Sequence, residues 1–368
     1  MPEVSDVVGI GLAGGQGMRA RPLTLKAPGY LRSKAAMSFL GRRLIRWVMT
    51  ILSSEGIKDY YVIAHGKENR YQIKVMIGYG EGFGVDVKYS PVKYDALSTG
   101  SADSALRLME YWDISQPALV FPTDSVIDFD LAPMVETHVG RGAVATIAAM
   151  MREPDEVAEK YGVMLTDGDG RVTEFVEKPT LGELREHFHA ETDDDFRQLP
   201  LMTNAGFYLL DTEVIRGLIG NAEIERLRRT RLDFGKDLLP WLVGNGYPVY
   251  AFPVRRIGDL GNVRDFLETM IDVLRGVQGG RPAPGAAVRH RAQRLDRAGI
   301  ARDARLDERY DAGREDRERR RPDRSGGSDR QVLRDPPRRP DPRVEPRRRH
   351  RGTARRARSS VRRSATAR

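Results

Sequence analysis

A glycine-rich segment with an arginine at its end follows the first apolar run of the chain. It consists of Gly11-Leu12-Ala13-Gly14-Gly15-Gln16-Gly17-Met18-Arg19. Small residues let backbone N–H groups converge on phosphate oxygens, and the arginine adds a permanently charged, forked hydrogen-bond donor. The segment therefore predicts a loop that holds phosphate groups.

Two interpretations of these glycines compete. Gly9-Ile10-Gly11-Leu12-Ala13-Gly14 is a literal G-x-G-x-x-G, which in a dinucleotide-binding fold is followed about 20 residues later by an acidic residue. No Asp or Glu occurs between Asp6 and Glu55. That stretch instead carries eight basic residues: Arg19, Arg21, Lys26, Arg32, Lys34, Arg42, Arg43 and Arg46. This favours a triphosphate held by Gly14-Gly15-Gln16-Gly17, with an NADP-dependent oxidoreductase as the alternative.

Two aspartates stand at positions suited to a metal ion. Asp124 comes directly after the apolar run 118–122, and Asp259 follows another strand-like run and lies between Gly258 and Gly261. Carboxylates held on separate loops are what a Mg²⁺ ion accepts alongside phosphate oxygens and waters. The alternative role for Asp124 is to cap the start of a helix.

Strand-like and helix-like stretches alternate through the first half of the chain and must position these residues. Strands are expected at 7–13, 59–64, 118–122 and 143–150, and helices at 44–54, 68–79 and 101–112. The alternation predicts an α/β fold with a doubly wound, mostly parallel mixed sheet. Because ligands bind outside the carboxyl ends of the strands in such sheets, chemistry is expected in the loops after Ala13 and Pro122.

A second sub-region begins with a predicted hairpin. The turn residues Asp167-Gly168-Asp169-Gly170 separate strand-like runs at 162–164 and 171–175. Further elements are expected as a strand at 205–210, a helix at 237–243, a strand at 249–254 and a helix at 263–274.

The charge of the chain is concentrated at its end. The formal net charge is +9, but residues 281–368 contain 29 arginines against 13 acidic residues, whereas the preceding part has 32 basic and 39 acidic residues. The tail has too few apolar side chains to offset chain entropy by burial. We predict a catalytic domain over 1–279 and an Arg- and Pro-rich tail over 280–368 that is disordered or frameshifted. With one tyrosine as its only aromatic residue, the tail is not expected to bind specific nucleic acid.

Composition narrows the function classes further. With 40% hydrophobic residues, the chain can bury a large core. It has no cysteine, which excludes disulfides and thiolate metal sites, and no apolar run approaches the ~18 residues of a membrane span. These features predict a soluble, cytoplasmic protein.

Several motifs, in order along the chain, resemble those of the sugar-phosphate nucleotidylyltransferases. Residues 12–24 are similar to the family signature A-G-G-x-G-T-R-L-x-P-L-T, with Met18 and Ala20 as departures. Residues 33–39 resemble the lysine element that follows it, at a longer spacing than usual, so Lys26 is a second candidate beside Lys34. The run 98–101 is similar to the nucleobase and ribose element L-G-T-A-G-A, with serines at both glycine positions.

The sugar-side motifs of the family also have counterparts. Lys160-Tyr161-Gly162-Val163 and Glu174-Phe175-Val176-Glu177-Lys178-Pro179 resemble two of them, and Thr203-Asn204-Ala205-Gly206-Phe207-Tyr208 is close to N-A-G-x-Y. On an extended chain the side chains of Glu177 and Lys178 are expected to face opposite ways. For Asn204 the alternative is a turn-forming role.

The resemblance implies roles for individual residues. The catalytic group would be Arg19, Lys34 and Asp124, and Asp124 and Asp259 would hold Mg²⁺. The nucleotide would be bound by Leu12, Ala13, Gly14, Gly15, Gln16, Gly17, Ser98, Thr99 and Gly100. The sugar phosphate would be bound by Gly162, Glu177, Lys178 and Asn204.

The resemblance also implies a reaction, in which a nucleoside triphosphate and a sugar 1-phosphate give a nucleotide sugar and pyrophosphate. A second alternative is a regulator that binds sugar nucleotides without turnover, suggested by Met18 and the lysine spacing. Many relatives assemble through a C-terminal β-helix of hexapeptide repeats, and the sequence contains no such repeats. A homo-oligomer is compatible with the sequence.

Overall fold

The computed structural model describes residues 3–14, 20–21, 23–27, 30–31, 33–95, 99–128, 130–188, 196 and 199–275. Residues 15–19 of the predicted phosphate loop, Ser98, and the predicted tail at 280–368 lie outside the described residues. All the elements below therefore belong to the part that was predicted to be a catalytic domain.

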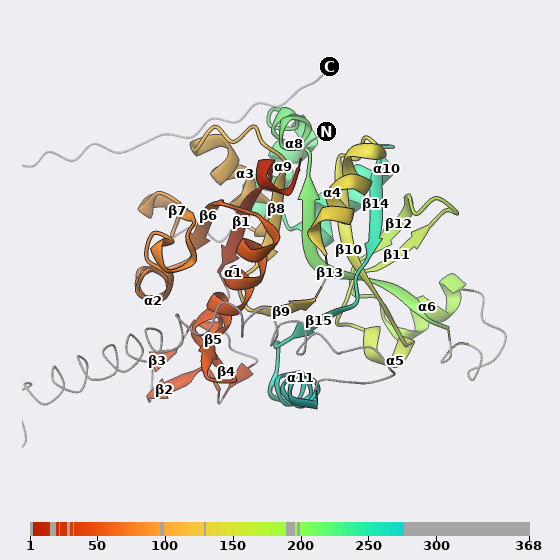
Figure 1. Ribbon diagram of the computed structural model, residues 1–368. Helices are drawn as coiled ribbons and strands as arrows, with labels where there is room; N and C mark the ends of the chain where they lie inside the picture. The colour runs from red at the N-terminus through yellow and green to blue at the C-terminus, as the bar shows by residue number, and fades with distance from the viewer. Residues whose placement is uncertain are drawn as a thin grey trace, which may run out of the picture. The chain divides into compact units, whose positions relative to one another are not determined.

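A nine-stranded mixed sheet forms the centre of the fold (Figure 1). Its strands follow the order β12-β11-β13-β8-β1-β6-β7, and β10 pairs with both β13 and β14. Strands β8, β1, β6 and β7 are parallel, whereas β13 is antiparallel to β8, β10 and β11. Their bounds are β1 (Val8–Ala13), β6 (Asp59–Ala64), β7 (Asp86–Tyr89), β8 (Ala118–Pro122), β10 (Ala145–Arg152), β11 (Val163–Thr166), β12 (Val172–Val176), β13 (Leu201–Leu210) and β14 (Val249–Pro253).

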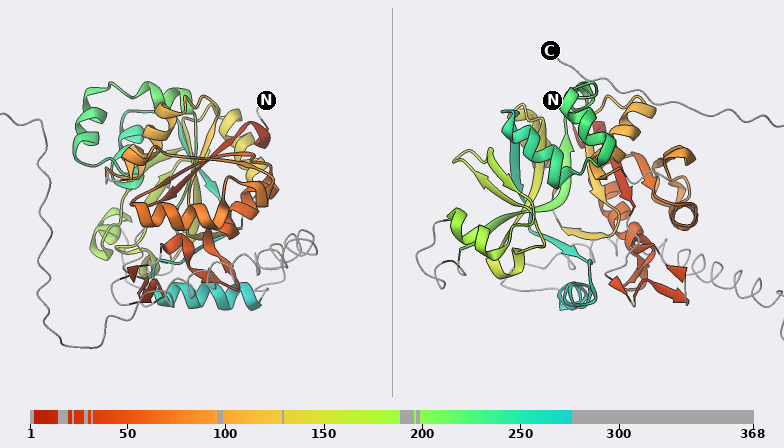
Figure 2. Two further views of the ribbon diagram at one scale, coloured as in Figure 1. Left: turned by 90° about the vertical axis from the view of Figure 1, so that its left-hand side faces the viewer. Right: turned by 180° about the vertical axis from the view of Figure 1, so that it is seen from behind.

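Helices cover both faces of this sheet (Figure 2). Strand β6 shows why: Tyr61 and Ile63 join the core under α3, α8, α9 and α10, while Tyr60 and Val62 join the core under α1, α2 and α4. Alternate side chains of a strand point to opposite faces, so a strand buried on both faces is apolar throughout. The helices are α1 (Leu44–Glu55), α2 (Lys67–Ile77), α3 (Ser101–Tyr111), α4 (Leu131–Gly140), α5 (Pro154–Val157), α6 (Leu181–Phe188), α8 (Thr212–Gly217), α9 (Ala222–Thr230), α10 (Leu239–Gly244) and α11 (Val263–Arg275).

Short helical turns and two-stranded sheets complete the described part. The turns are η1 (Val4–Asp6), η3 (Lys34–Ala36), η4 (Glu81–Phe83), η5 (Val92–Tyr94) and the π-helical turn η6 (Phe234–Leu238). The two-stranded sheets pair β2 (Leu25–Ala27) with β3 (Tyr30–Leu31), β4 (Ser38–Phe39) with β5 (Arg42–Arg43), and β9 (Ser125–Asp128) with β15 (Arg256–Asp259). Helix α11 packs on β4, with the rings of Phe266 and Phe39 edge to face at 5.5 Å.

The predicted α/β class with a doubly wound mixed sheet is confirmed. The strands expected at 59–64 and 118–122 coincide with β6 and β8, and the turn at 167–170 does join the antiparallel pair β11 and β12. The sequence did not reveal β7, β9, β15, α4, α8 or α9. Strands β9 and β15 are four residues each, too short to show a clear periodicity, and within the described residues they form a two-stranded sheet with each other.

Candidate active site

The carboxyl ends of β1 and β8 lie side by side. The two strands pair in parallel with Leu12 opposite Pro122, so the loop after Ala13 and the residue Asp124 leave the sheet at the same edge. Buried Thr123 donates its hydroxyl to the carbonyl oxygen of Leu12 at 3.2 Å, and its backbone N–H to the same oxygen at 3.4 Å. These bonds hold Asp124 beside the start of the predicted phosphate loop.

Lys34 forms an ion pair with Asp124. Its Nζ lies 2.7 Å from Asp124 Oδ2, and the two side chains are 15% and 20% exposed. The turn that carries Lys34 is anchored to α2, because the side chain of Gln72 accepts a hydrogen bond from the backbone N–H of Ser33 at 3.0 Å. The fold thus brings Lys34 to the predicted metal ligand, while the side chain of the rival Lys26 lies outside the described residues.

The backbone of Asp259, more than a hundred residues further along the chain, lies beside the segment that carries Asp124. In the β9–β15 pair, Asp259 is opposite Ser125, the residue after Asp124. Gly258 allows α11 to approach closely, since a Cβ there would lie 2.3 Å from Cγ2 of Thr269. The side chain of Asp259 lies outside the described residues, but its backbone position adjoins that of Asp124, as a two-carboxylate site requires.

This donor set fits a magnesium ion. Mg²⁺ is commonly held by one or two carboxylates, with substrate phosphates and waters filling the other positions. Among the side chains that the structure describes, no group of three or more histidine or acidic residues gathers into a metal cluster. Asp124 supplies one partly exposed carboxylate, and the backbone of Asp259 lies beside it, which is compatible with the two carboxylates that such a site uses.

The start of the phosphate loop is tightly packed. A Cβ on Gly14 would lie 2.4 Å from Cδ2 of His65, so this position needs glycine. Asn69 of α2 donates its side-chain amide to the carbonyl of Ala13, and His65 Nε2 lies 3.4 Å from the hydroxyl of Ser104. Gly15, Gln16, Gly17 and Arg19 lie outside the described residues, so their contribution stays a prediction.

The other glycines of the literal G-x-G-x-x-G have a packing role. Gly9 and Gly11 lie within β1, where a Cβ would come within 2.6 Å of the Tyr60 ring and 3.2 Å of the Phe121 ring. Close approach of aromatic rings to the strand therefore accounts for both. Gly9 and Gly11 therefore no longer support the interpretation as a dinucleotide-binding turn.

The basic stretch behind the loop serves more than one purpose. Arg42 lies over the Trp47 ring at 5.6 Å, Arg46 over the Phe83 ring at 4.8 Å, and buried Arg43 donates to the Ala36 carbonyl at 3.2 Å. These contacts hold the β4–β5 hairpin and the first turn of α1. These three arginines therefore have structural partners. The prediction of triphosphate binding is kept only for the basic residues nearer the loop.

Thr99 and Gly100 precede α3 and pack against Leu232. Gly100 has φ +103°, and a Cβ there would lie 2.2 Å from the Leu232 carbonyl oxygen. That oxygen accepts hydrogen bonds from the N–H groups of Ala102 and Asp103, and the N–H of Leu232 donates to the carbonyl of Thr99 at 2.8 Å. The start of α3 is therefore bound to a segment more than a hundred residues further along.

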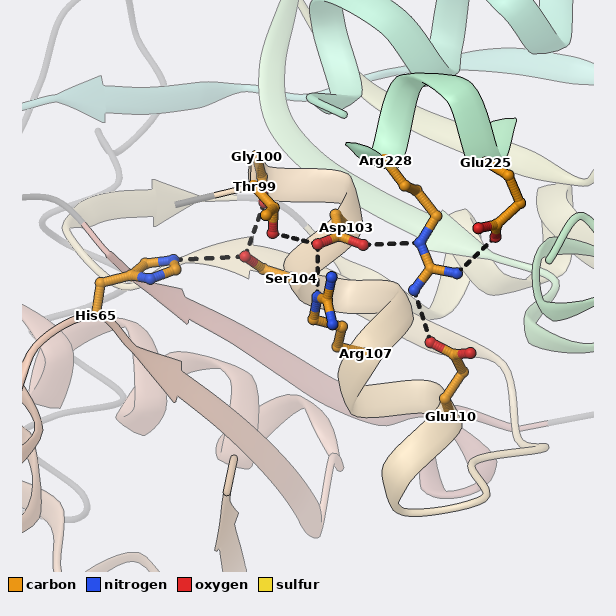
Figure 3. A network of polar contacts seen from close by, with 9 residues as sticks. All are labelled: His65, Thr99, Gly100, Asp103, Ser104, Arg107, Glu110, Glu225 and Arg228. Atoms are coloured by element: carbon orange, nitrogen blue, oxygen red, sulfur yellow. Dashed lines mark hydrogen bonds and ion pairs between the residues drawn. The ribbon is translucent and has the colours of Figure 1, made fainter. Parts of the chain in front are cut away.

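A polar network centred on Asp103 secures the same helix start (Figure 3). Asp103 is 0% exposed and accepts hydrogen bonds from the Thr99 hydroxyl, from Arg107 Nε at 2.6 Å and from Arg228 Nε at 2.8 Å. Arg228 of α9 also pairs with Glu110 and Glu225. In addition, the hydroxyl of Ser104 donates to the Gly100 carbonyl at 2.7 Å.

On the sugar side, Glu177 occupies a slot between two glycines. A Cβ on Gly162 would lie 2.8 Å from Glu177 Oε2, and one on Gly235 would lie 2.4 Å from it. Burial raises the pKa of the Glu177 carboxyl, the nearby Lys178 ammonium opposes this, and the charge of Asp233 adds to the rise. The carboxylate is thus confined and partly desolvated, as a group that orients a ligand should be.

The expected geometry of Lys178 is wrong. Strand β12 ends at Val176, and Lys178 has φ +50°, in the left-handed region. Its Nζ therefore turns back to lie 3.4 Å from Glu177 Oε1 instead of facing the opposite way. At 50% exposure, the ammonium is open to an anionic partner.

Asn204 lies at an irregularity of β13. Its N–H donates to the Gly162 carbonyl at 2.8 Å, its Oδ1 accepts from the N–H of Gly206 at 2.8 Å, and its Nδ2 donates to the Tyr208 hydroxyl at 3.0 Å. Gly206 has φ +81°. The side chain thus fixes the local backbone, and a contact with sugar would come in addition to that role.

The structure also reveals residues that the sequence reasoning missed. Asp233, Phe234 and Gly235 lie between the start of α3 and Glu177, and Phe234 stacks on Tyr208 with ring centroids 4.6 Å apart. In the sequence, the signal for this segment is Asp233, because an Asp directly before a helical run is a common N-cap.

Comparison with known proteins identifies the family of the chain. A family described as nucleotidyl transferase matches residues 8–276. The chain belongs to the nucleotidyl transferase family. It is 29% identical over 287 residues to a UTP–glucose-1-phosphate uridylyltransferase from Synechocystis sp., covering 76% of this chain and 66% of that protein. It is 27% identical over 287 residues to a glucose-1-phosphate adenylyltransferase from Fervidobacterium nodosum, covering 74% and 63%.

The family assignment extends to the fold. A Bacillus anthracis protein assigned as a glucose-1-phosphate thymidylyltransferase, crystallised with sucrose, superposes with a TM-score of 0.56 at 22% identity, covering 75% of this chain and 98% of that one. The chain spans slightly less than two thirds of the length of the two family members from Synechocystis and Fervidobacterium. Among the helices of the described part, none is long and apolar enough to cross a membrane.

Proposed function

We propose that this chain transfers a nucleotidyl group from a nucleoside triphosphate to a sugar 1-phosphate, with pyrophosphate as the second product. The observation that carries the proposal is the Lys34–Asp124 pair at 2.7 Å, beside the start of the phosphate loop and next to the Asp259 backbone. A lysine and two carboxylates from three separate segments suit the handling of phosphate groups with a metal ion.

The reaction is an in-line displacement. An oxygen of the sugar phosphate attacks the α-phosphorus, the bond from that phosphorus to the bridging oxygen of the β-phosphate breaks, and pyrophosphate leaves with the electron pair. The nucleophile is already an anion, so it needs no general base. The barrier lies in charge repulsion and alignment, which a protein lowers by positioning and electrostatics.

The proposed catalytic residues provide this positioning and electrostatic stabilisation. Lys34 and Arg19 neutralise charge on the transferring and leaving phosphates, and Asp124 and Asp259 would hold Mg²⁺. When bound, that ion supplies positive charge to the phosphate oxygens of both substrates. Burial of Thr123 and the anchoring of η3 keep Asp124 and Lys34 in place without substrate.

The two substrates would lie on either side of this centre. We assign the nucleotide to residues 12–17 and 98–100, and the sugar phosphate to Gly162, Glu177, Lys178 and Asn204. In this assignment Glu177 accepts hydrogen bonds from sugar hydroxyls and the half-exposed Lys178 pairs with the phosphate.

A pyrophosphate-release assay tests the proposal. ATP, GTP, CTP, UTP and dTTP are each offered with glucose 1-phosphate and with mannose 1-phosphate, in the presence of Mg²⁺. We expect release with at least one pair and none without the sugar phosphate. Nucleotide binding without release in any pair would overturn the proposal in favour of a non-catalytic sugar-nucleotide-binding regulator. A spectral change on adding NADPH, without release, would favour the oxidoreductase.

A further inference from the structure

Residues 232–235 contact the nucleotide element directly. Besides the backbone bonds of Leu232 to the start of α3, Asp233 Oδ1 accepts a hydrogen bond from the N–H of Ser101 at 2.9 Å. The hydroxyl of Ser101 in turn accepts from the N–H of Phe234 at 3.0 Å. The segment and the helix start therefore satisfy each other's backbone groups.

The same four residues contact the sugar element. Gly235 lies against the Glu177 carboxylate so closely that a Cβ would overlap it, at 2.4 Å from Oε2 and 2.9 Å from Cδ. Phe234 stacks on Tyr208, whose hydroxyl accepts from the side chain of Asn204. Gly235 lies in the π-helical turn η6, an irregularity that is frequent at functional sites.

Charge reinforces the link between the two sides. Burial opposes ionisation of Asp233, but hydrogen bonds from Ser101 and Arg231 hold its pKa below the ordinary value. The resulting charge acts on the Glu177 carboxyl. A shift of the start of α3 therefore changes both the position and the electrostatics of the segment against Glu177.

We propose that residues 232–235 form a bridge segment that couples the two substrate sites, with Asp233 positioning the start of α3 and Gly235 positioning Glu177. This inference rests on the proposed function for the identity of the two ligands. Nucleotide binding at Thr99 and Gly100 shifts the start of α3 and, through the bridge segment, the slot for Glu177, so the first substrate strengthens binding of the second. Because the coupling is a free energy, it is reciprocal.

Gly235→Ala tests the sugar end of the bridge segment. The added methyl group meets the far end of a flexible side chain, so Glu177 moves while the fold is retained. We expect the KM for the sugar 1-phosphate to rise about tenfold, with the KM for the triphosphate and the melting temperature almost unchanged. Gly244→Ala is the matched control, because a Cβ at that helical glycine meets nothing within 4 Å.

Asp233→Asn tests the coupling itself. Binding of glucose 1-phosphate and of mannose 1-phosphate is measured by calorimetry with and without the α,β-methylene analogues of ATP, UTP and dTTP. In the unsubstituted protein we expect the analogue to strengthen sugar-phosphate binding about fivefold or more, within the usual range of such couplings. In Asp233→Asn we expect no strengthening. Asp211→Asn is the control, since Asp211 also accepts a backbone N–H at a helix start, from Val214 at 3.1 Å.

The outcomes separate the inference from the function on which it rests. If the analogue strengthens sugar-phosphate binding equally in Asp233→Asn and in Asp211→Asn, the bridge segment does not couple the sites, although the proposed reaction stands. If both ligands bind with coupling but no pyrophosphate is released, the reaction fails and the bridge is retained. If the unsubstituted protein shows no coupling, or Gly235→Ala leaves the sugar-phosphate KM unchanged, the inference is wrong.

Discussion

Asp103 and Asp124 are both aspartates paired with cationic side chains, but their surroundings differ. Asp103 is fully buried and receives three hydrogen bonds, two of them from arginines on α3 and α9. Asp124 is 20% exposed and pairs with Lys34, at the sheet edge where two strands end. A carboxylate surrounded by donors on all sides can hold helices together but cannot take a ligand.

The two aspartates illustrate the difference between a charge that stabilises the fold and a charge that is accessible to a ligand. Removing one partner of a buried ion pair leaves an uncompensated charge and costs stability, whereas a partly exposed carboxylate can be lost with little effect on folding. Substitution of Asp103 should therefore lower stability, whereas substitution of Asp124 should lower activity.

Asp124→Asn should abolish most of the activity and leave the fold intact. The neutral amide binds Mg²⁺ more weakly than a carboxylate does, and it cannot pair with the Lys34 ammonium as a charge. We expect kcat to fall about 10³-fold, within the range for losing one electrostatic group at a reacting centre. The melting temperature should fall less than in Asp103→Ala, because Asp124 and Lys34 both keep some solvent exposure. The measurement is pyrophosphate release beside thermal unfolding, and a large loss of stability with activity retained would reverse the assignment.

Asp103→Ala should destabilise the protein strongly. It leaves Arg107 and Arg228 without their shared carboxylate, and Arg228 is 11% exposed. We expect unfolding in urea to require about 3–5 kcal/mol less free energy. Asp113→Ala is the control: Asp113 is 86% exposed and pairs with Arg216 at 2.6 Å, so its loss should cost less than about 1 kcal/mol. Equal effects of the two substitutions would contradict the structural role of Asp103.

His138 is a buried polar group that, unlike Asp103, is kept neutral instead of being paired with a charge. Burial lowers the pKa of His138 to about 4, while Asp211 partly opposes the shift. The unfolded chain binds the proton first as pH falls, so stability is complete above about pH 6.5 and is lost between there and pH 4, by up to about 3 kcal/mol.

His138→Gln tests this by removing the titrating group. Urea unfolding between pH 7 and pH 4.5 should show a shallower loss of stability in the variant than in the unsubstituted protein. An identical pH dependence in the two proteins would assign the acid sensitivity to other groups.

Thr99→Val tests whether the Asp103 network reaches the nucleotide element. The substitution removes the hydroxyl that donates to Asp103 while keeping the volume. We expect a loss of about 1.5 kcal/mol in unfolding free energy, typical of a hydrogen bond to a charged group, and a rise of a few fold in the triphosphate KM. A triphosphate KM that stays constant while stability falls would confine the network to a structural role.

Part of this site was predictable from residue types alone. The apolar run 118–122 is continuous, so β8 and the place of Asp124 just beyond it could be inferred. Gly14 and Gly100 were predicted to bind the nucleotide, which stays a prediction, whereas their close packing on His65 and on Leu232 is visible only in the structure. The turn of Lys178 was not predictable, because its left-handed backbone depends on the end of β12 and not on its own side chain.

The family, the α/β alternation and the loops that follow β1 and β8 can be inferred from the amino-acid sequence alone, because periodicity, glycine spacing and motifs can be recognised without knowing the fold. Which distant residues come into contact is visible only in the folded structure. The β9–β15 pair brings Asp259 to Asp124, and the folding back of residues 232–235 ties the start of α3 to Glu177. Such long-range contacts depend on the path of the whole chain and on the burial that stabilises the fold. No single stretch of sequence contains that information.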